Sequence, residues 1–224
     1  MGVAAIVPAR DEAARISETV RALSDIADIT ETIVVDDAST DGTADRARAA
    51  GALVIRLPAR RGKGGALRAG LERTTAEILV FIDGDLGATA EVARVLLAPI
   101  VAGDADMTIA APSPGKPSGF GVVEGLSRAG IRALTGHRFA RPLSGQRALR
   151  RDVVARAPIA PRFGVETALT IDALRAGFRV VEIPVEFEHA RTERNAAGFG
   201  HRARQGRDVA LALLSRLRPR RARA

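Results

Sequence analysis

The chain has 224 residues, 46% of them hydrophobic, so it can bury a substantial core, and it has no cysteine, which excludes a disulfide scaffold and a cysteine-ligated zinc site. The net charge is +8, and five arginines in residues 216–224 supply more than half of it. With no Trp, no Tyr and seven Phe, the chain has too few aromatic side chains for a single-strand nucleic-acid platform.

The N-terminal apolar run bears on where the protein works. It covers only residues 3–7 and has no basic region before it, so it is too short for a signal peptide or a membrane span. No later apolar run approaches the ~20 residues that a spanning helix needs. We therefore expect a cytoplasmic protein without a nucleic-acid partner.

The first 103 residues alternate short apolar runs with helical patterns. Runs rich in Val and Ile predict strands at residues 3–7, 32–35, 53–57 and 78–82. Helices are predicted over residues 16–23, 42–50, 64–73 and 89–101. This alternation predicts an α/β fold, a mostly parallel, Rossmann-like sheet with helices on both faces. The apolar runs are continuous, as in strands that are covered on both sides.

After Gly103 the pattern changes. A Pro/Gly/Ser loop is predicted over residues 112–121, and a break over 140–145. Helices are predicted over 122–134, 164–176 and 198–217, the last one basic and amphipathic with Val209, Leu213 and Leu217 on one stripe. A strand over 180–187 contains Pro184, which indicates an edge position or a bulge.

Polar motifs follow all four strands of the first half. They occupy residues 8–12, 36–42, 60–64 and 83–85. Taken singly, 36–42 is typical of a turn and helix cap, and 60–64 of a solvated loop. Ligands of open parallel sheets bind beyond the carboxyl ends of the strands, so the four motifs together predict one binding site.

The residue types at this edge suit a nucleotide with a metal. Asp83 and Asp85, with Gly84 between them, can bind a hard divalent cation such as Mg²⁺ or Mn²⁺, which fills its shell with phosphate oxygens. Lys63, in a glycine-flanked loop, offers a cation and backbone N–H groups to the same diphosphate. Asp37 can accept a hydrogen bond from a nucleobase imide. Such a site needs no nucleophile from the protein.

Four segments in this order resemble the family 2, GT-A-type glycosyltransferases over residues 3–90: IVPARDE, IVVDDASTDGT, RGKGGALRAG and ILVFIDGDLG. The resemblance implies a GT-A fold, Mg²⁺ or Mn²⁺ as cofactor, and a UDP-sugar donor, with UDP-glucose favoured. It also implies a set of nucleotide-sugar-binding residues: Pro8, Ala9, Arg10, Glu12, Asp37, Lys63, Asp83 and Gly84. One departure is Asp11, where the family usually has Asn.

The second half narrows the resemblance. RPLSGQRALRRDVV, FGVETALTIDALRAG and VEIPVEFEHA are similar to bacterial glucosyl-3-phosphoglycerate synthases and their mannosyl relatives, up to about residue 190. This implies that Glu166 contacts the donor sugar and that His189 joins Asp85 in binding the metal. The relatives clamp phosphoglycerate with an Arg and a Thr, and residues 118–124 here contain neither, which puts that acceptor in doubt.

We therefore expect one GT-A domain over residues 1–218, followed by a basic tail at 219–224. Residues 1–103 would be its nucleotide-sugar-binding half and 104–218 its acceptor half. The expected activity is a metal-dependent hexosyl transfer to a small or lipid-linked acceptor, and the second-half resemblance favours retention of configuration. The expected catalytic residues are Lys63, Asp85 and Glu166.

Three alternatives stay open. A polyprenyl-phosphate glycosyltransferase at the membrane surface shares the first half and a segment near residues 144–147. A sugar nucleotidylyltransferase shares the sheet, but its glycine-rich loop after the first strand is absent from residues 8–12. A basic binding protein with a degenerate site would tolerate loss of Asp85. A homodimer and a peripheral membrane contact of the basic C-terminus are also left open.

Overall fold

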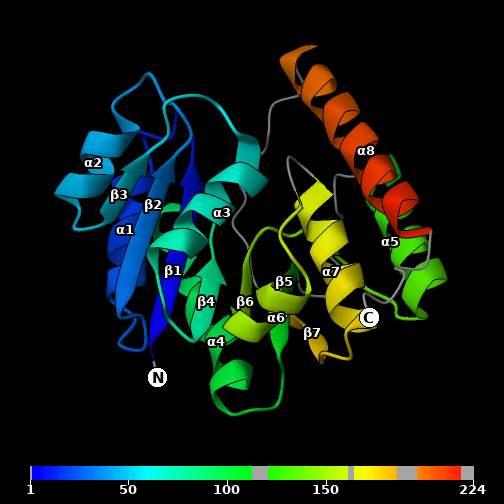
Figure 1. The fold of residues 1–224 in the computed structure, drawn as a ribbon. Helices are drawn as coiled ribbons and strands as arrows, with labels where there is room; N and C mark the ends of the chain where they lie inside the picture. Colours follow the sequence, from blue (N-terminus) through cyan, green and yellow to red (C-terminus); the bar gives the residue numbers. More distant parts are fainter. Residues whose placement is uncertain (1, 113–120, 161–163, 186–195, 218–224) are drawn as a thin grey trace.

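The computed structural model describes residues 2–112, 121–160, 164–185 and 196–217. They form a seven-stranded sheet in the order β3-β2-β1-β4-β6-β5-β7, with helices on both faces (Figure 1). The strands are β1 (Val3–Ala9), β2 (Glu31–Asp36), β3 (Leu53–Arg56), β4 (Ile78–Phe81), β5 (Met107–Pro112), β6 (Arg147–Arg150) and β7 (Val180–Val185). The helices are α1 (Ile16–Ser24), α2 (Thr43–Ala49), α3 (Gly62–Arg73), α4 (Val92–Val101), α5 (Gly121–Thr135), α6 (Arg151–Arg156), α7 (Val165–Arg175) and α8 (Ala196–Leu217).

The parallel part of the sheet is confirmed. β1 pairs in parallel with β2 and β4, and β2 pairs in parallel with β3. Alternate residues of β1 enter two separate cores, which explains its continuous apolar run. Ala5 and Val7 pack in the core under α1 and α4, whereas Ala4 and Ile6 pack in the core under α3 and α7.

The second part of the chain completes the same sheet in a way the pattern did not predict. β5, β6 and α6 were all missed. β6 lies between β4 and β5 and runs antiparallel to both. It is only four residues long and contains Arg147 and Arg150, so its apolar signal is weak. The edge position predicted from Pro184 is confirmed, since β7 pairs with β5 alone among the described strands.

Two helix predictions need correction. The helix predicted over 89–101 begins at Val92, because Gly87–Glu91 forms a 3-10 turn. In α8, Val209 and Leu213 are buried as predicted, but Leu217 is 62% exposed. α8 packs on α5 and α7 rather than on the sheet (Figure 1). Within the described part of the chain, no helix has the length and apolarity needed to cross a bilayer.

Candidate functional site

The carboxyl ends of β1 and β4 meet closely, and Gly84 makes this possible. A Cβ at Gly84 would lie 3.1 Å from the Cβ of Ala9 and 3.5 Å from Cγ of Glu12. A larger residue at this position would therefore require Ala9 to shift by a few tenths of an ångström. Pro8 and Ala9 end β1, opposite Val35 and Asp36 of β2. The sheet thus brings the segments 8–12 and 83–85 together, as the sequence predicted.

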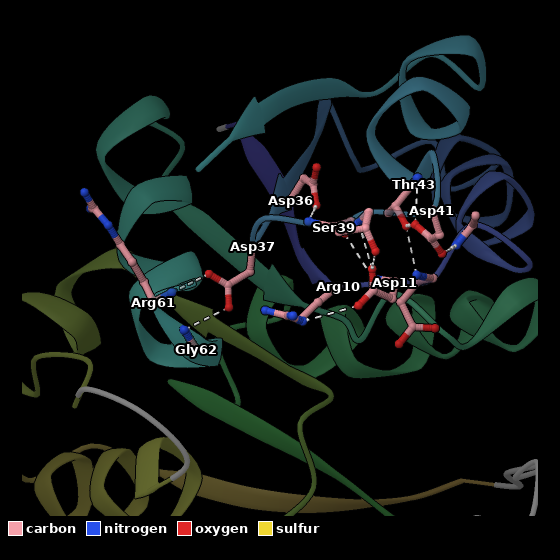
Figure 2. A network of polar contacts seen from close by, with 12 residues as sticks. Arg10, Asp11, Asp36, Asp37, Ser39, Asp41, Thr43, Arg61 and Gly62 are labelled. Atoms are coloured by element: carbon pink, nitrogen blue, oxygen red, sulfur yellow. Dashed lines mark hydrogen bonds and ion pairs between the residues drawn. The ribbon is translucent and has the colours of Figure 1, made fainter. Parts of the chain in front are cut away.

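The turns after β1 and β2 are tied to each other by side chains (Figure 2). The backbone N–H of Asp11 donates to Oγ of Ser39 at 2.9 Å, and the N–H of Thr40 donates to Oδ1 of Asp11 at 2.9 Å. Asp11 has φ 55°, in the left-handed region that Asp tolerates better than most residues. The departure from Asn keeps the oxygen used here. Oδ2 of Asp11 lies 3.3 Å from Nε of Arg10.

Asp37 binds the N-terminus of α3 (Figure 2). Its Oδ1 accepts from the backbone N–H of Arg61 at 2.6 Å, and its Oδ2 from the N–H of Gly62 at 2.8 Å. Both oxygens therefore already have a donor, so a nucleobase imide would have to share one of them. The direct consequence of the geometry is different: Asp37 fixes the start of α3. Lys63 is the second residue of this helix, so it lies in a helix that begins at Gly62 and not in the predicted loop.

Lys63 joins the two parts of the chain. Its Nζ lies 2.5 Å from Oδ1 of Asp83, beyond β4, and 3.0 Å from Oε1 of Glu166, in the first turn of α7. Burial opposes the charge of Lys63, but Asp83 and Glu166 outweigh it and raise the pKa of Lys63 above its ordinary value. The three groups predicted from separate motifs thus form one partly buried ion-pair cluster.

Glu12 and Asp85 extend this cluster on its acidic side. Burial, with repulsion from Asp85 and Asp83, raises the pKa of Glu12 from 4.5 to about 7. Burial and the charge of Asp83 also raise the pKa of Asp85. These carboxylates repel one another, and a divalent cation would relieve that repulsion.

A metal would need ligands beyond this cluster. Among the described residues, no group of three or more His, Asp or Glu side chains is arranged to hold an ion. Mg²⁺ and Mn²⁺ typically take one or two carboxylates and complete their shell with water and substrate phosphate. The carboxylates present fit that pattern. His189, the other predicted ligand, lies outside the described residues.

The sequence analysis missed a further part of the site, the loop before β6. Nε2 of Gln146 donates to Oδ2 of Asp83 at 2.8 Å, and Oγ of Ser144 donates to Oε1 of Gln146 at 3.0 Å. A Cβ at Gly145 would overlap Nζ of Lys63 and lie 2.5 Å from Oδ2 of Asp83. The loop therefore closes directly over the Lys63–Asp83 pair. Its similarity to known glycosyltransferases near residues 144–147 was the available signal.

The comparisons with known proteins agree with this geometry. The chain matches the family model described as Glycosyl transferase family 2 over residues 4–143. Among curated proteins, the glucosyl-3-phosphoglycerate synthases of Mycolicibacterium paratuberculosis and Mycobacterium tuberculosis are 31% and 32% identical over 194 and 197 residues. These alignments cover 76% of this chain but 59% and 60% of the relatives, so the chain spans about 60% of their length.

Solved structures show the same fold. The M. tuberculosis glucosyl-3-phosphoglycerate synthase with Mn²⁺, UDP-glucose and phosphoglyceric acid is 31% identical and has a TM-score of 0.79, covering 96% of this chain and 79% of that one. The same enzyme with Mg²⁺ and UDP is 31% identical, with a TM-score of 0.78 and the same coverage. The predicted GT-A fold is confirmed.

Proposed function

Since the chain belongs to glycosyl transferase family 2, we propose that it is a metal-dependent glycosyltransferase that moves a glucosyl group from UDP-glucose to a small phosphorylated acceptor. The observation that carries this is the cluster of Glu12, Lys63, Asp83, Asp85 and Glu166 at one edge of the sheet. Its similarity to enzymes solved with UDP-glucose, Mn²⁺ and phosphoglyceric acid supports the donor and the acceptor class.

We assign the donor to the first half of the chain. The turns at residues 8–12 and 36–42 bind the nucleotide, since they lie side by side at the carboxyl ends of β1 and β2 and are joined by hydrogen bonds. Lys63 faces the diphosphate, since its ammonium lies between the carboxylates of Asp83 and Glu166. Glu166, the second carboxylate that pairs with Lys63, contacts the sugar. With Lys63 at the diphosphate and Glu166 at the sugar, a positive charge lies where negative charge builds up on the leaving group.

We assign the metal to Asp85, together with His189 as implied by the resemblance. When bound, the cation supplies positive charge to the leaving diphosphate. The chain's own groups do the rest: Asp83 and Glu166 hold the Lys63 ammonium in place, and Gly145 and Gln146 cover it from solvent. A fixed, partly buried cation acts more strongly than a mobile one at the surface.

The acceptor is assigned by class alone. The relatives' structures contain phosphoglyceric acid, which supports a small phosphorylated molecule. The Arg and Thr that clamp it in those enzymes are missing from residues 118–124, so we do not extend the assignment to phosphoglycerate itself. A polyprenyl-phosphate acceptor has less support, because the first curated relatives act on a soluble one.

The test is a product search with isotope-labelled UDP-glucose, Mg²⁺ and a pool of small phosphorylated metabolites, read by mass spectrometry. We expect a hexose-bearing product that disappears in Asp85→Ala and persists in Asp104→Ala, an exposed carboxylate ahead of β5. No labelled product from any pool would refute the proposal. Formation of UDP-glucose from UTP and glucose 1-phosphate would instead indicate a nucleotidylyltransferase.

A further inference from the structure

Arg147, the first residue of β6, is the largest fully buried side chain in the described part of the chain. It is only 1% exposed, yet none of its described hydrogen-bond partners is a carboxylate. A buried guanidinium normally has an anionic partner, since removing a charge from water is costly. Burial accordingly lowers the pKa of Arg147 to about 10, against the attraction of Glu166, Glu182 and Asp83. The group remains charged at neutral pH.

The three hydrogen bonds of Arg147 join two separate segments. Nε donates to the carbonyl of Ser144 at 3.0 Å, and Nη2 donates to the carbonyl of Pro142 at 2.7 Å. Nη1 donates to Oγ1 of Thr170 in α7 at 2.9 Å. The planar guanidinium group of Arg147 thus binds both the loop before β6 and α7. A lysine ammonium has no such fixed geometry.

Both segments carry groups of the candidate site. In the loop before β6, Ser144 donates to Gln146 at 3.0 Å, and Gln146 donates to Asp83 at 2.8 Å. On the helix side, Oγ1 of Thr170 donates to the backbone carbonyl of Glu166 at 2.8 Å. Asp83 and Glu166 are the two carboxylates that hold Lys63.

We propose that Arg147 is a positioning residue that sets the distance between Asp83 and Glu166, and through them the place of Lys63. It does not touch the donor itself, because it is buried beneath the loop. The inference rests on the proposed function for its catalytic meaning, but the structural connection stands without it. Displacing a catalytic group by about 1 Å can lower a rate by about 100-fold.

The first test is amide hydrogen exchange of the wild type, Arg147→Lys and the control Arg151→Lys. Arg151 is a matched control, since it also donates to two backbone carbonyls, those of Ala76 and Thr74, before β4 and away from the site. We expect Arg147→Lys to speed exchange about 10-fold or more in residues 142–147 and 165–175, and Arg151→Lys to leave both segments unchanged. Equal exchange in the wild type and Arg147→Lys would overturn the proposal.

The second test separates positioning from general destabilisation. The affinity for uridine should change less than about 3-fold in Arg147→Lys, because the nucleoside lies on the turns at residues 8–12 and 36–42, whereas Lys63 faces the diphosphate. The kcat for sugar transfer should fall about 10- to 100-fold. A loss confined to KM would contradict the assignment. If the wild type itself has no turnover, the proposed function fails, while the exchange experiment still decides the role of Arg147.

If Arg147→Lys does not fold, Thr170→Val takes its place. This variant keeps the volume of the side chain and removes the hydroxyl that accepts from Arg147 and donates to the carbonyl of Glu166. Faster exchange should then appear in residues 165–175 and not in 142–147. Unchanged exchange in both segments would refute the connection through Thr170.

Discussion

Glu12 offers a direct measurement of the repulsion in the candidate site. Its pKa is raised from 4.5 to about 7, first by burial and then by Asp85 and Asp83. Between these two pH values the folded protein keeps a proton on Glu12 that the unfolded chain has released. The free energy of unfolding therefore falls as the pH rises through this window, and the loss is complete above about pH 7.

The magnitude follows from the same pair of values. A change in pKa from 4.5 to about 7 corresponds to about 3 kcal/mol, since each tenfold change in an equilibrium constant is worth about 1.4 kcal/mol. Glu12 is only partly buried, so solvent screening lowers this figure, and we expect about 1–2 kcal/mol. In Glu12→Gln, which cannot ionise, this contribution to the pH dependence should vanish.

The assay is urea unfolding at a series of pH values from 5 to 8, without metal. From pH 5 to pH 8, the free energy of unfolding of Glu12→Gln should rise by about 1–2 kcal/mol relative to that of the wild type. The control Glu72→Gln, an exposed carboxylate on α3, should follow the wild-type curve. Adding Mg²⁺ and UDP should stabilise the wild type more at pH 8 than at pH 5, because the cation favours the ionised cluster. Parallel curves for Glu12→Gln and the wild type would refute the reasoning.

Four further outcomes are expected. Asp85→Ala should abolish turnover and remove the Mg²⁺ dependence of UDP binding while the Tm stays equal or rises; calorimetry showing equal wild-type UDP affinity in Mg²⁺ and in EDTA would contradict this. Gly145→Ala should fold but lose about 10-fold or more in kcat, because the new methyl group displaces Lys63; wild-type kinetics would show that the loop yields freely. His189→Ala should weaken Mn²⁺ binding about 10-fold or more, and the affinity of the wild type for Mn²⁺ should decrease when the pH is lowered below ~6.5. An Mn²⁺ titration of His189→Ala that matches the wild type would show that His189 does not bind the metal. Leu211 and Leu214 are exposed on α8 and are followed by four arginines in 218–224, so we expect the protein to sediment with vesicles of anionic lipid. Leu214→Ser should no longer sediment with the vesicles, whereas the α4 control Val95→Ser should. A wild-type protein that stays in solution would exclude the contact.

The first half of the site was predictable because each motif is local. A strand ends, and the next few residues are the ones at the sheet edge, so position in the sequence gives position in space. Asp83, Gly84 and Asp85 follow β4 in this way, and Lys63 lies in the first turn of α3, the helix after β3. The pattern could not show that Asp37 would bind the backbone of Arg61 and Gly62, because the path of a loop depends on its tertiary contacts.

The role of Arg147 was hidden for a different reason. In a sequence, arginine is typical of an exposed position, and its neighbours in β6 give a weak strand signal. Only packing shows that this side chain is buried and that its partners are carbonyls and a hydroxyl far apart in the chain. Glu166 was found by resemblance, and its contact with Lys63 likewise needed the second half to fold over the sheet edge.

Ligands of parallel sheets bind beyond the carboxyl ends of the strands, and this rule predicted only part of the site because β6 is antiparallel. Parallel strands reach the site with their last residues, whereas β6 reaches the same edge with the residues that precede it. Phe81 pairs with Arg147, and continuing this register two residues past β4 places Asp83 opposite Gly145. The contact of Gln146 with Asp83 and the close approach of Gly145 therefore follow from sheet pairing. A slip of one residue would move Arg147 to the other face and separate the loop from α7, so the same register that builds the sheet also sets the geometry around Lys63.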